Sequence, residues 1–144
     1  MSTDRAATLA HWWQERIPFN RRCHIRVASW TDDGVSMEVD SADELSNGVG
    51  SIHGGVVATL IDTAANAAAI TVDDFGPGSL VATVSMTVHY VGPARGHLVA
   101  TATCVRRGGT LRSVTVDVRD DTSAVVAHGV VVVKVSAAAT PAPR

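Results

Sequence analysis

The chain has 144 residues, of which 46% are hydrophobic and 18% are charged, and its formal net charge at pH 7 is −2. This length suits one domain and is enough to bury a core without disulfides. The small negative charge argues against a nucleic-acid-binding protein that relies on overall positive charge. The N-terminus has no signal-peptide pattern, and no apolar run reaches the roughly 18 residues of a membrane span. We therefore expect a cytoplasmic protein without nucleic-acid or membrane partners.

Several common chemistries have no motif in this sequence. Cys23 and Cys104 are the only cysteines, and they lie far apart without the spacing of metal ligands, so we expect them to be small hydrophobic residues. The histidines show neither His-x-His nor His-Glu-x-x-His spacing, so we expect no metal site. The Gly-x-Ser-x-Gly elbow of serine hydrolases, the nucleotide P-loop and the dinucleotide fingerprint are also missing.

The first predicted element is an amphipathic helix over residues 3–16. Leu9, Trp12 and Trp13 share an apolar stripe on it, and Pro18 predicts its end. The two tryptophans are suited to packing, and they could also line the mouth of a pocket.

A hairpin and a polar connection follow this helix. Loosely alternating residues over 23–30 and 35–39, with Asp32-Asp33-Gly34 between them, predict two antiparallel strands. Residues 40–46 are polar and lead into a glycine-rich loop.

The centre of the chain is this loop and the helix-length run that follows it. Residues 47–55 read Asn-Gly-Val-Gly-Ser-Ile-His-Gly-Gly, and residues 56–70 are mostly small and apolar, with Asp62 as their single acid. A helix that is apolar on every face is normally buried. We therefore expect the Asp62 carboxylate to lie in or beside a pocket, where lost hydration must be offset by a partner or a function.

The second half of the chain predicts a sheet. After a turn-rich linker at 73–79, four strand-like segments follow at 80–91, 97–106, 110–119 and 124–135. Their short connections imply antiparallel neighbours. We predict an α+β domain over residues 1–135, with a curved antiparallel sheet around the central helix, and a disordered Ala/Pro-rich tail at 136–144.

Strict alternation along the segment 80–91 predicts two faces. One face would carry Val81, Thr83, Ser85, Thr87 and His89, and the other would carry Leu80, Ala82, Val84, Met86, Val88 and Tyr90.

The set formed by Asn47, His53-Gly54-Gly55 and Asp62 resembles the hotdog-fold acyl-CoA thioesterases of the phenylacetic-acid-degradation type. The resemblance extends from about Asn47 to Val135 and more loosely to the start of the chain. It implies a hotdog fold, in which the sheet wraps the long central helix. It also implies hydrolysis of an acyl-CoA thioester to a free acid and CoA, with no cofactor beyond the CoA of the substrate.

The resemblance assigns catalytic roles to five residues. Asp62 would act as general base for a water or as nucleophile, and both routes stay open. The backbone N–H of Gly54, at a helix N-terminus where such groups lack intrahelical partners, would stabilise the oxyanion. His53 and Asn47 would shape the loop and position the thioester or the water, or only structure the loop. Thr83 would orient the water, or serve only as a good strand former.

The CoA end of the substrate is expected at two turns. Arg95 in one turn, and Arg107, Gly109 and Thr110 in another, offer guanidinium and N–H groups suited to phosphates, although arginine at a strand end is also an ordinary solvated residue. The acyl group is expected to be aromatic or a medium to long chain, in an apolar pocket walled by Trp12, Trp13, Phe75 or Met86.

The resemblance also implies an assembly, and two other functions remain open. Related proteins form homodimers in which Asp62 of one chain would face the His53-Gly54 loop of the other, and tetramers of such dimers are common. The alternatives are an acyl-CoA-binding protein without catalysis and a hotdog enoyl-CoA hydratase or dehydratase. Hydratases of this fold usually carry an Asp-x-Asn-Pro-x-His stretch, which this chain lacks.

Overall fold

The computed structural model describes residues 1–70, 75–76 and 78–136. The helices in this part of the chain are α1 (Thr3–Glu15), α2 (Pro18–Arg22) and α3 (Gly54–Ala69), with a short 3₁₀ turn at Asp43–Leu45. The strands are β1 (Arg26–Trp30), β2 (Val35–Asp40), β3 (Leu80–Tyr90), β4 (His97–Arg107), β5 (Leu111–Arg119) and β6 (Val125–Ser136).

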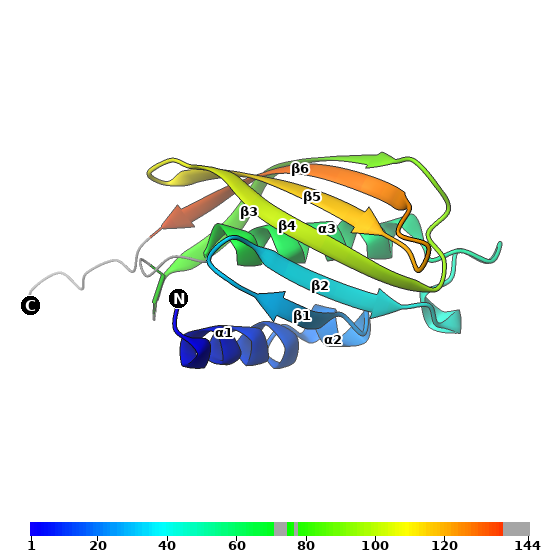
Figure 1. Cartoon of the computed structure of the whole chain (residues 1–144), viewed down its shortest axis with the longest axis horizontal. Coiled ribbons are helices and arrows are strands. Elements are labelled where there is room, and N and C mark those ends of the chain that lie inside the picture. The colour runs from blue at the N-terminus through cyan, green and yellow to red at the C-terminus, as the bar shows by residue number, and fades with distance from the viewer. Residues whose placement is uncertain (71–74, 77, 137–144) are drawn as a thin grey trace, which may run out of the picture.

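The strands of the described residues form one six-stranded antiparallel sheet in the order β1-β2-β4-β5-β6-β3. The sheet curves around α3, while α1 and α2 lie along the β1 edge (Figure 1). The predicted α+β class and the hotdog arrangement are confirmed. The expectation that the strands at 80–91 and 97–106 are neighbours is wrong: β3 pairs with β6, and β4 lies between β2 and β5. The connection between them does not form a hairpin, because it begins against Val126 of β6 and ends against Ser41 after β2.

Small side chains let α3 lie close to the sheet. Ala64, Ala65 and the alanines at 67–69 are fully buried. On the facing strand, a Cβ atom added to Gly129 would lie 2.5 Å from Cγ2 of Ile61, so only glycine fits at this approach. The burial of α3 confirms the expectation that this nearly all-apolar helix lies inside the fold.

The structure corrects the prediction for residues 16–25. Pro18 does not only end the first helix; it occupies the first turn of α2, where its fixed φ favours a helix and its missing N–H costs nothing. The strand predicted from residue 23 therefore begins only at Arg26. His24 between them has a φ of 56°, and Ile25 enters the core with 2% of its surface exposed.

The two predicted faces of β3 are also wrong. In the pairing with β6, Thr83 lies opposite Val133 and Ser85 lies opposite Val132, so Val84 has no partner. This bulge reverses the alternation. Before the bulge, the side chains that face α3 are those of Val81 and Thr83; after it, they are those of Met86, Val88 and Tyr90. All five residues pair with buried residues of β6. Strict alternation fails because a bulge adds one residue to one strand only.

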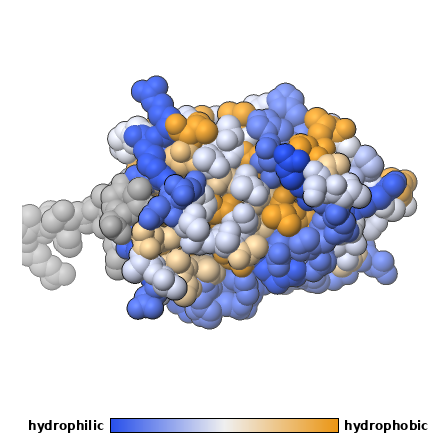
Figure 2. Space-filling model, viewed as in Figure 1, coloured by the Kyte–Doolittle hydropathy of each residue, from blue (hydrophilic) through white to orange (hydrophobic). Residues whose placement is uncertain are grey.

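The described surface is mixed in character. Figure 2 shows hydrophilic residues along the edge where α1 and α2 lie, and separate hydrophobic patches over the strands. No helix within the described ranges has the length and hydropathy to cross a membrane. The predicted tail at 136–144 lies outside the described residues, except for Ser136 at the end of β6, and so do residues 73, 74 and 77 of the predicted linker.

Candidate active site

Asp62 lies in the middle of α3 and is half-buried. Its Oδ1 atom accepts a hydrogen bond from the Thr83 hydroxyl at 2.5 Å and a longer one from Asn66 Nδ2 at 3.3 Å. Its Oδ2 atom accepts no hydrogen bond from the described part of the chain. The carboxylate is thus held through one oxygen, and the other is available to a water or a substrate.

Asn66 connects these groups. It lies one helical turn after Asp62 and is 8% exposed. Its Nδ2 atom also approaches the Thr83 hydroxyl oxygen at 2.8 Å and the Asp62 carbonyl oxygen at 2.8 Å. Since Asn66 donates to the Thr83 oxygen, the Thr83 proton is directed to the carboxylate, and both side chains donate to the same charged group.

A second polar cluster fastens α3 to the N-terminal helices beside Asp62. The Thr63 hydroxyl oxygen accepts from Trp13 Nε1 at 2.9 Å and from Asn20 Nδ2 at 2.9 Å. Asn20 Nδ2 also donates to the Trp13 carbonyl oxygen at 3.1 Å. Trp13 is 3% exposed, so the prediction that it serves packing is confirmed, and it brings α1 against the residue next to Asp62.

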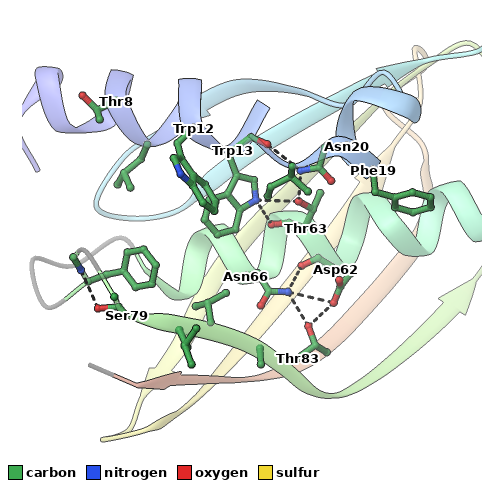
Figure 3. A pocket seen from close by; sticks show the side chains of 18 of the residues that line it. Thr8, Trp12, Trp13, Phe19, Asn20, Asp62, Thr63, Asn66, Ser79 and Thr83 are labelled. Atoms are coloured by element: carbon green, nitrogen blue, oxygen red, sulfur yellow. Dashed lines mark hydrogen bonds between the residues drawn. The ribbon is translucent and has the colours of Figure 1, made fainter. Parts of the chain in front are cut away.

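A cavity of about 1180 Å³ opens beside the carboxylate (Figure 3). Asp62, Asn66 and Thr83 lie at one side of it, and apolar side chains from α1, α2 and β3 form much of the rest. The apolar lining includes Leu9, Trp12, Trp13, Ile17, Phe19, Phe75, Leu80 and Val81. The predicted wall residues Trp12, Trp13 and Phe75 are among them, whereas Met86 is not. The site therefore places a carboxylate next to a space suited to an apolar group.

The loop before α3 is organised by two of the predicted residues. Asn47 Oδ1 accepts from the N–H groups of Val49 and Ser51, which closes the loop on itself. His53 is the N-cap of α3, and its Nδ1 atom accepts from the Gly55 N–H at 2.9 Å. Since Nδ1 accepts, the ring proton is on Nε2.

Gly54 presents the donor that the motif implies. Its backbone N–H has no hydrogen-bond acceptor among residues 1–70, 75–76 and 78–136, whereas the next N–H groups of α3 are bound to His53. An unpaired N–H at a helix N-terminus attracts negative charge. The sequence reasoning did not identify Tyr90, whose hydroxyl donates to the Gly54 carbonyl oxygen at 2.9 Å.

The two halves of the predicted catalytic set are separated within one chain. Gly54 and Asp62 are eight residues apart on one helix, which at about 1.5 Å per residue is roughly 12 Å. The cavity beside Asp62 has neither His53 nor Gly54 in its lining. One thioester carbonyl cannot contact both the Gly54 N–H and the Asp62 carboxylate of the same chain.

The predicted CoA-binding residues form two groups. Arg95 Nε donates to the Gly50 carbonyl oxygen at 3.2 Å, so this arginine borders the loop that contains His53. Arg107, Gly109 and Thr110 lie at the other end of β4, where Arg107 Nη2 donates to the Asp32 carbonyl oxygen at 3.2 Å. The structure does not bring the two groups together in one chain, because the strand between them spans about 33 Å.

The remaining reactive residues lie outside this site. Burial raises the pKa of the Cys23 thiol, which keeps it protonated. On the outer sheet face, His97 and Arg26 bind Asp40 and hold the pKa of its carboxyl below the usual range. Among the described residues there is no cluster of three His, Cys, Asp or Glu side chains that could hold a metal ion.

The amino-acid sequence is similar to known proteins of one family. The model of the family described as Thioesterase superfamily matches residues 49–127. Human acyl-coenzyme A thioesterase 13 is 31% identical over 108 residues, which cover 73% of this chain and 75% of that protein. A protein of Halobacterium salinarum, provisionally named an esterase, is 37% identical over 90 residues, and the match spans 60% of each chain.

Solved structures share the fold. A protein of Shewanella oneidensis related to the thioesterase superfamily superposes with a TM-score of 0.83 at 20% identity, over 92% of this chain and 96% of that one. A thioesterase family protein of Silicibacter pomeroyi gives 0.81 at 21% identity, over 90% and 96%. These likenesses, at such low identity, concern the architecture alone.

Proposed function

The chain belongs to the thioesterase superfamily, and we propose that it is an acyl-CoA thioesterase of the phenylacetic-acid-degradation type. The observation that carries this proposal is the Asp62 carboxylate, which is held through Oδ1 by Thr83 and Asn66 beside an apolar cavity. The acyl group occupies that cavity, and Oδ2 faces the thioester. The reaction needs no cofactor beyond the CoA of the substrate.

The chemistry follows from these positions. Asp62 either removes a proton from a water that attacks the thioester carbonyl carbon, or attacks that carbon itself to give a mixed anhydride that water then hydrolyses. The oxygen of the tetrahedral intermediate is stabilised by the Gly54 N–H. The C–S bond then breaks, and CoA leaves as a thiolate that takes up a proton.

The active site is shared between two subunits. The separation of about 12 Å along α3 supports this arrangement, in which the Gly54 N–H comes from a second chain. The exposed edge strand β3, which includes Thr83 and Tyr90, is where the second subunit would pair to extend the sheet, as the family resemblance implies. We propose a homodimer on this basis, and a tetramer of two such dimers.

The CoA moiety extends away from the loop that contains His53. Arg95 is the nearer of the predicted cations to that loop, because it binds Gly50, and it would contact a phosphate of CoA. Arg107, Gly109 and Thr110 lie about the length of β4 away and would reach the same CoA only from another subunit.

Release of CoA from a panel of aryl- and fatty-acyl-CoA thioesters, followed with a thiol reagent, tests the proposed reaction. The native protein is compared with Asp62→Ala and Asp62→Asn. We expect turnover by the native protein that falls at least a hundredfold in both variants, because both lack the base or nucleophile.

The outcomes separate the alternatives. Tight binding without turnover would favour an acyl-CoA-binding protein. Activity that survives in both variants would mean that another group performs the chemistry. Circular dichroism and sedimentation of the variants show whether they keep the native fold and assembly.

A further inference from the structure

Tyr90 is joined to His53 by a chain of two hydrogen bonds through one peptide group. The Tyr90 hydroxyl donates to the Gly54 carbonyl oxygen at 2.9 Å. The N–H of that same peptide group belongs to Gly55 and donates to His53 Nδ1 at 2.9 Å. A hydrogen bond accepted by a peptide oxygen polarises the peptide and strengthens its N–H as a donor.

This chain of hydrogen bonds selects one form of the His53 ring. Nδ1 must be unprotonated to accept from Gly55, so the proton is on Nε2, on the side of the ring away from the helix. His53 then has an Nε2–H donor, and the following residue, Gly54, has an N–H without an acceptor in the described part of the chain. The two donors belong to adjacent residues on the loop.

The local packing leaves little freedom to this arrangement. A Cβ atom on Gly55 would lie 2.9 Å from His53 Nδ1, so a larger residue would displace the ring. The Tyr90 ring lies against Gly54, at 3.4 Å from the position of an added Cβ. Tyr90 faces α3 only because of the bulge at Val84, since without it Thr83 and Tyr90 would lie on opposite faces of the strand.

We propose that Tyr90 is a positioning residue that holds His53 as an Nε2–H donor, so that His53 and the Gly54 N–H together bind the thioester oxygen. This role rests on the proposed thioesterase function. Tyr90 itself does not touch the substrate; it acts through the Gly54–Gly55 peptide.

Nitrogen NMR of protein with ¹⁵N-labelled histidine, together with kinetics, tests this role in Tyr90→Phe. The variant removes one hydroxyl and keeps the ring on Gly54. His53→Gln identifies the His53 signals among the six histidines. Thr103→Val, on the outer face of β4 in the interior of the sheet, is the matched control, because the Thr103 hydroxyl has no hydrogen bond among the described residues.

In the native protein we expect His53 to show an unprotonated Nδ1 and a protonated Nε2. In Tyr90→Phe we expect these signals to move towards a mixture of both tautomers, and kcat to fall about five- to tenfold with KM little changed, as loss of one hydrogen bond predicts. Thr103→Val should change neither measurement.

Three results would overturn the proposal: a native His53 with its proton on Nδ1, unchanged His53 signals in Tyr90→Phe, or unchanged kcat in that variant. A lower melting temperature with unchanged His53 signals would show that Tyr90 has a structural role only. If the native protein releases no CoA from any thioester, the proposed function fails and the role of Tyr90 fails with it. If the native protein is active and Tyr90→Phe has the same kcat and the same His53 signals, only the role of Tyr90 is overturned.

Discussion

The two oxygens of the Asp62 carboxylate have different surroundings. Oδ1 accepts from Thr83 and Asn66, while Oδ2 has no protein donor in the described part of the chain. Hydrogen bonds to a charged group contribute more than those between neutral groups, and they also fix its orientation. The donors therefore determine where the free oxygen points, which is the property a base or nucleophile needs.

Removal of the Thr83 hydroxyl should reduce catalysis more than stability. Thr83→Val keeps the shape of the side chain and removes the donor to Oδ1. We expect kcat to fall about ten- to a hundredfold, the range for a hydrogen bond to a charged group. Steady-state kinetics with the best thioester of the panel measure this.

The matched control is Thr83→Ser, which retains the hydroxyl and should keep kcat within about threefold of the native value. If Thr83→Val were as active as Thr83→Ser, the hydroxyl would have no part in the reaction.

Helix α1 forms one wall of the cavity because it is fastened to α3. The connection is the buried cluster of Trp13, Asn20 and Thr63, next to Asp62. Trp30 of β1 packs against Trp13 with ring centroids 5.6 Å apart in an edge-to-face arrangement. Through these contacts the N-terminal helices belong to the site and do not merely cover the sheet.

Thr63→Val should loosen this connection. The substitution keeps the volume and leaves Trp13 Nε1 and Asn20 Nδ2 without their shared acceptor, which is costly for buried donors. We expect the free energy of unfolding to fall by about 1–2 kcal/mol, because each donor retains one weaker carbonyl acceptor.

Urea denaturation at a fixed protein concentration measures this change. Thr103→Val on the exposed face of β4 is the control and should stay within about 0.5 kcal/mol of the native protein. Equal stabilities of the two variants would mean that the cluster does not hold α1 in place.

At the scale of the whole molecule, the proposed homodimer would bring together the Gly54 N–H and the Asp62 carboxylate, which lie apart in one chain. Gly54 and Asp62 lie about 12 Å apart on α3, so a thioester bound to both has to lie between chains. This assembly can be tested without a structure of the dimer, by complementation between two inactive variants.

Gly54→Pro and Asp62→Asn should each be inactive, yet regain activity when co-expressed. Proline is favoured at the first helical position, so Gly54→Pro removes the N–H donor with little disturbance. In a mixed dimer one of the two sites has both native groups. A purified mixed dimer should therefore have about half of the native activity, and the unseparated mixture about a quarter.

Purified mixed dimers, separated by two different affinity tags, give the measurement. The control is each variant co-expressed with itself under both tags, which should stay inactive. Inactive mixed dimers would show that each site is built from one chain.

Sequence patterns predicted local features well and sheet pairing in part. Asn47, His53, Gly54 and Asp62 lie within sixteen residues, so their places on one loop and one helix follow from local chain geometry. The antiparallel pairs β4–β5 and β5–β6 follow from short connections between strand-like segments, whereas the pairing of β3 with β6 does not. The α+β class could be predicted because these local signals agreed with one arrangement, and the family resemblance implied that this arrangement is the hotdog fold.

The sequence alone determined the class of fold and the motif of Asn47, His53, Gly54 and Asp62, because glycine, turn and helix signals act over a few residues. Only the tertiary structure decided what meets across the fold. The bulge at Val84, which places both Thr83 and Tyr90 on the face towards α3, depends on how β3 fits against β6 and not on its own residue pattern. The contact of Trp13 with Thr63 likewise depends on packing between segments far apart in the chain, which periodicity does not encode.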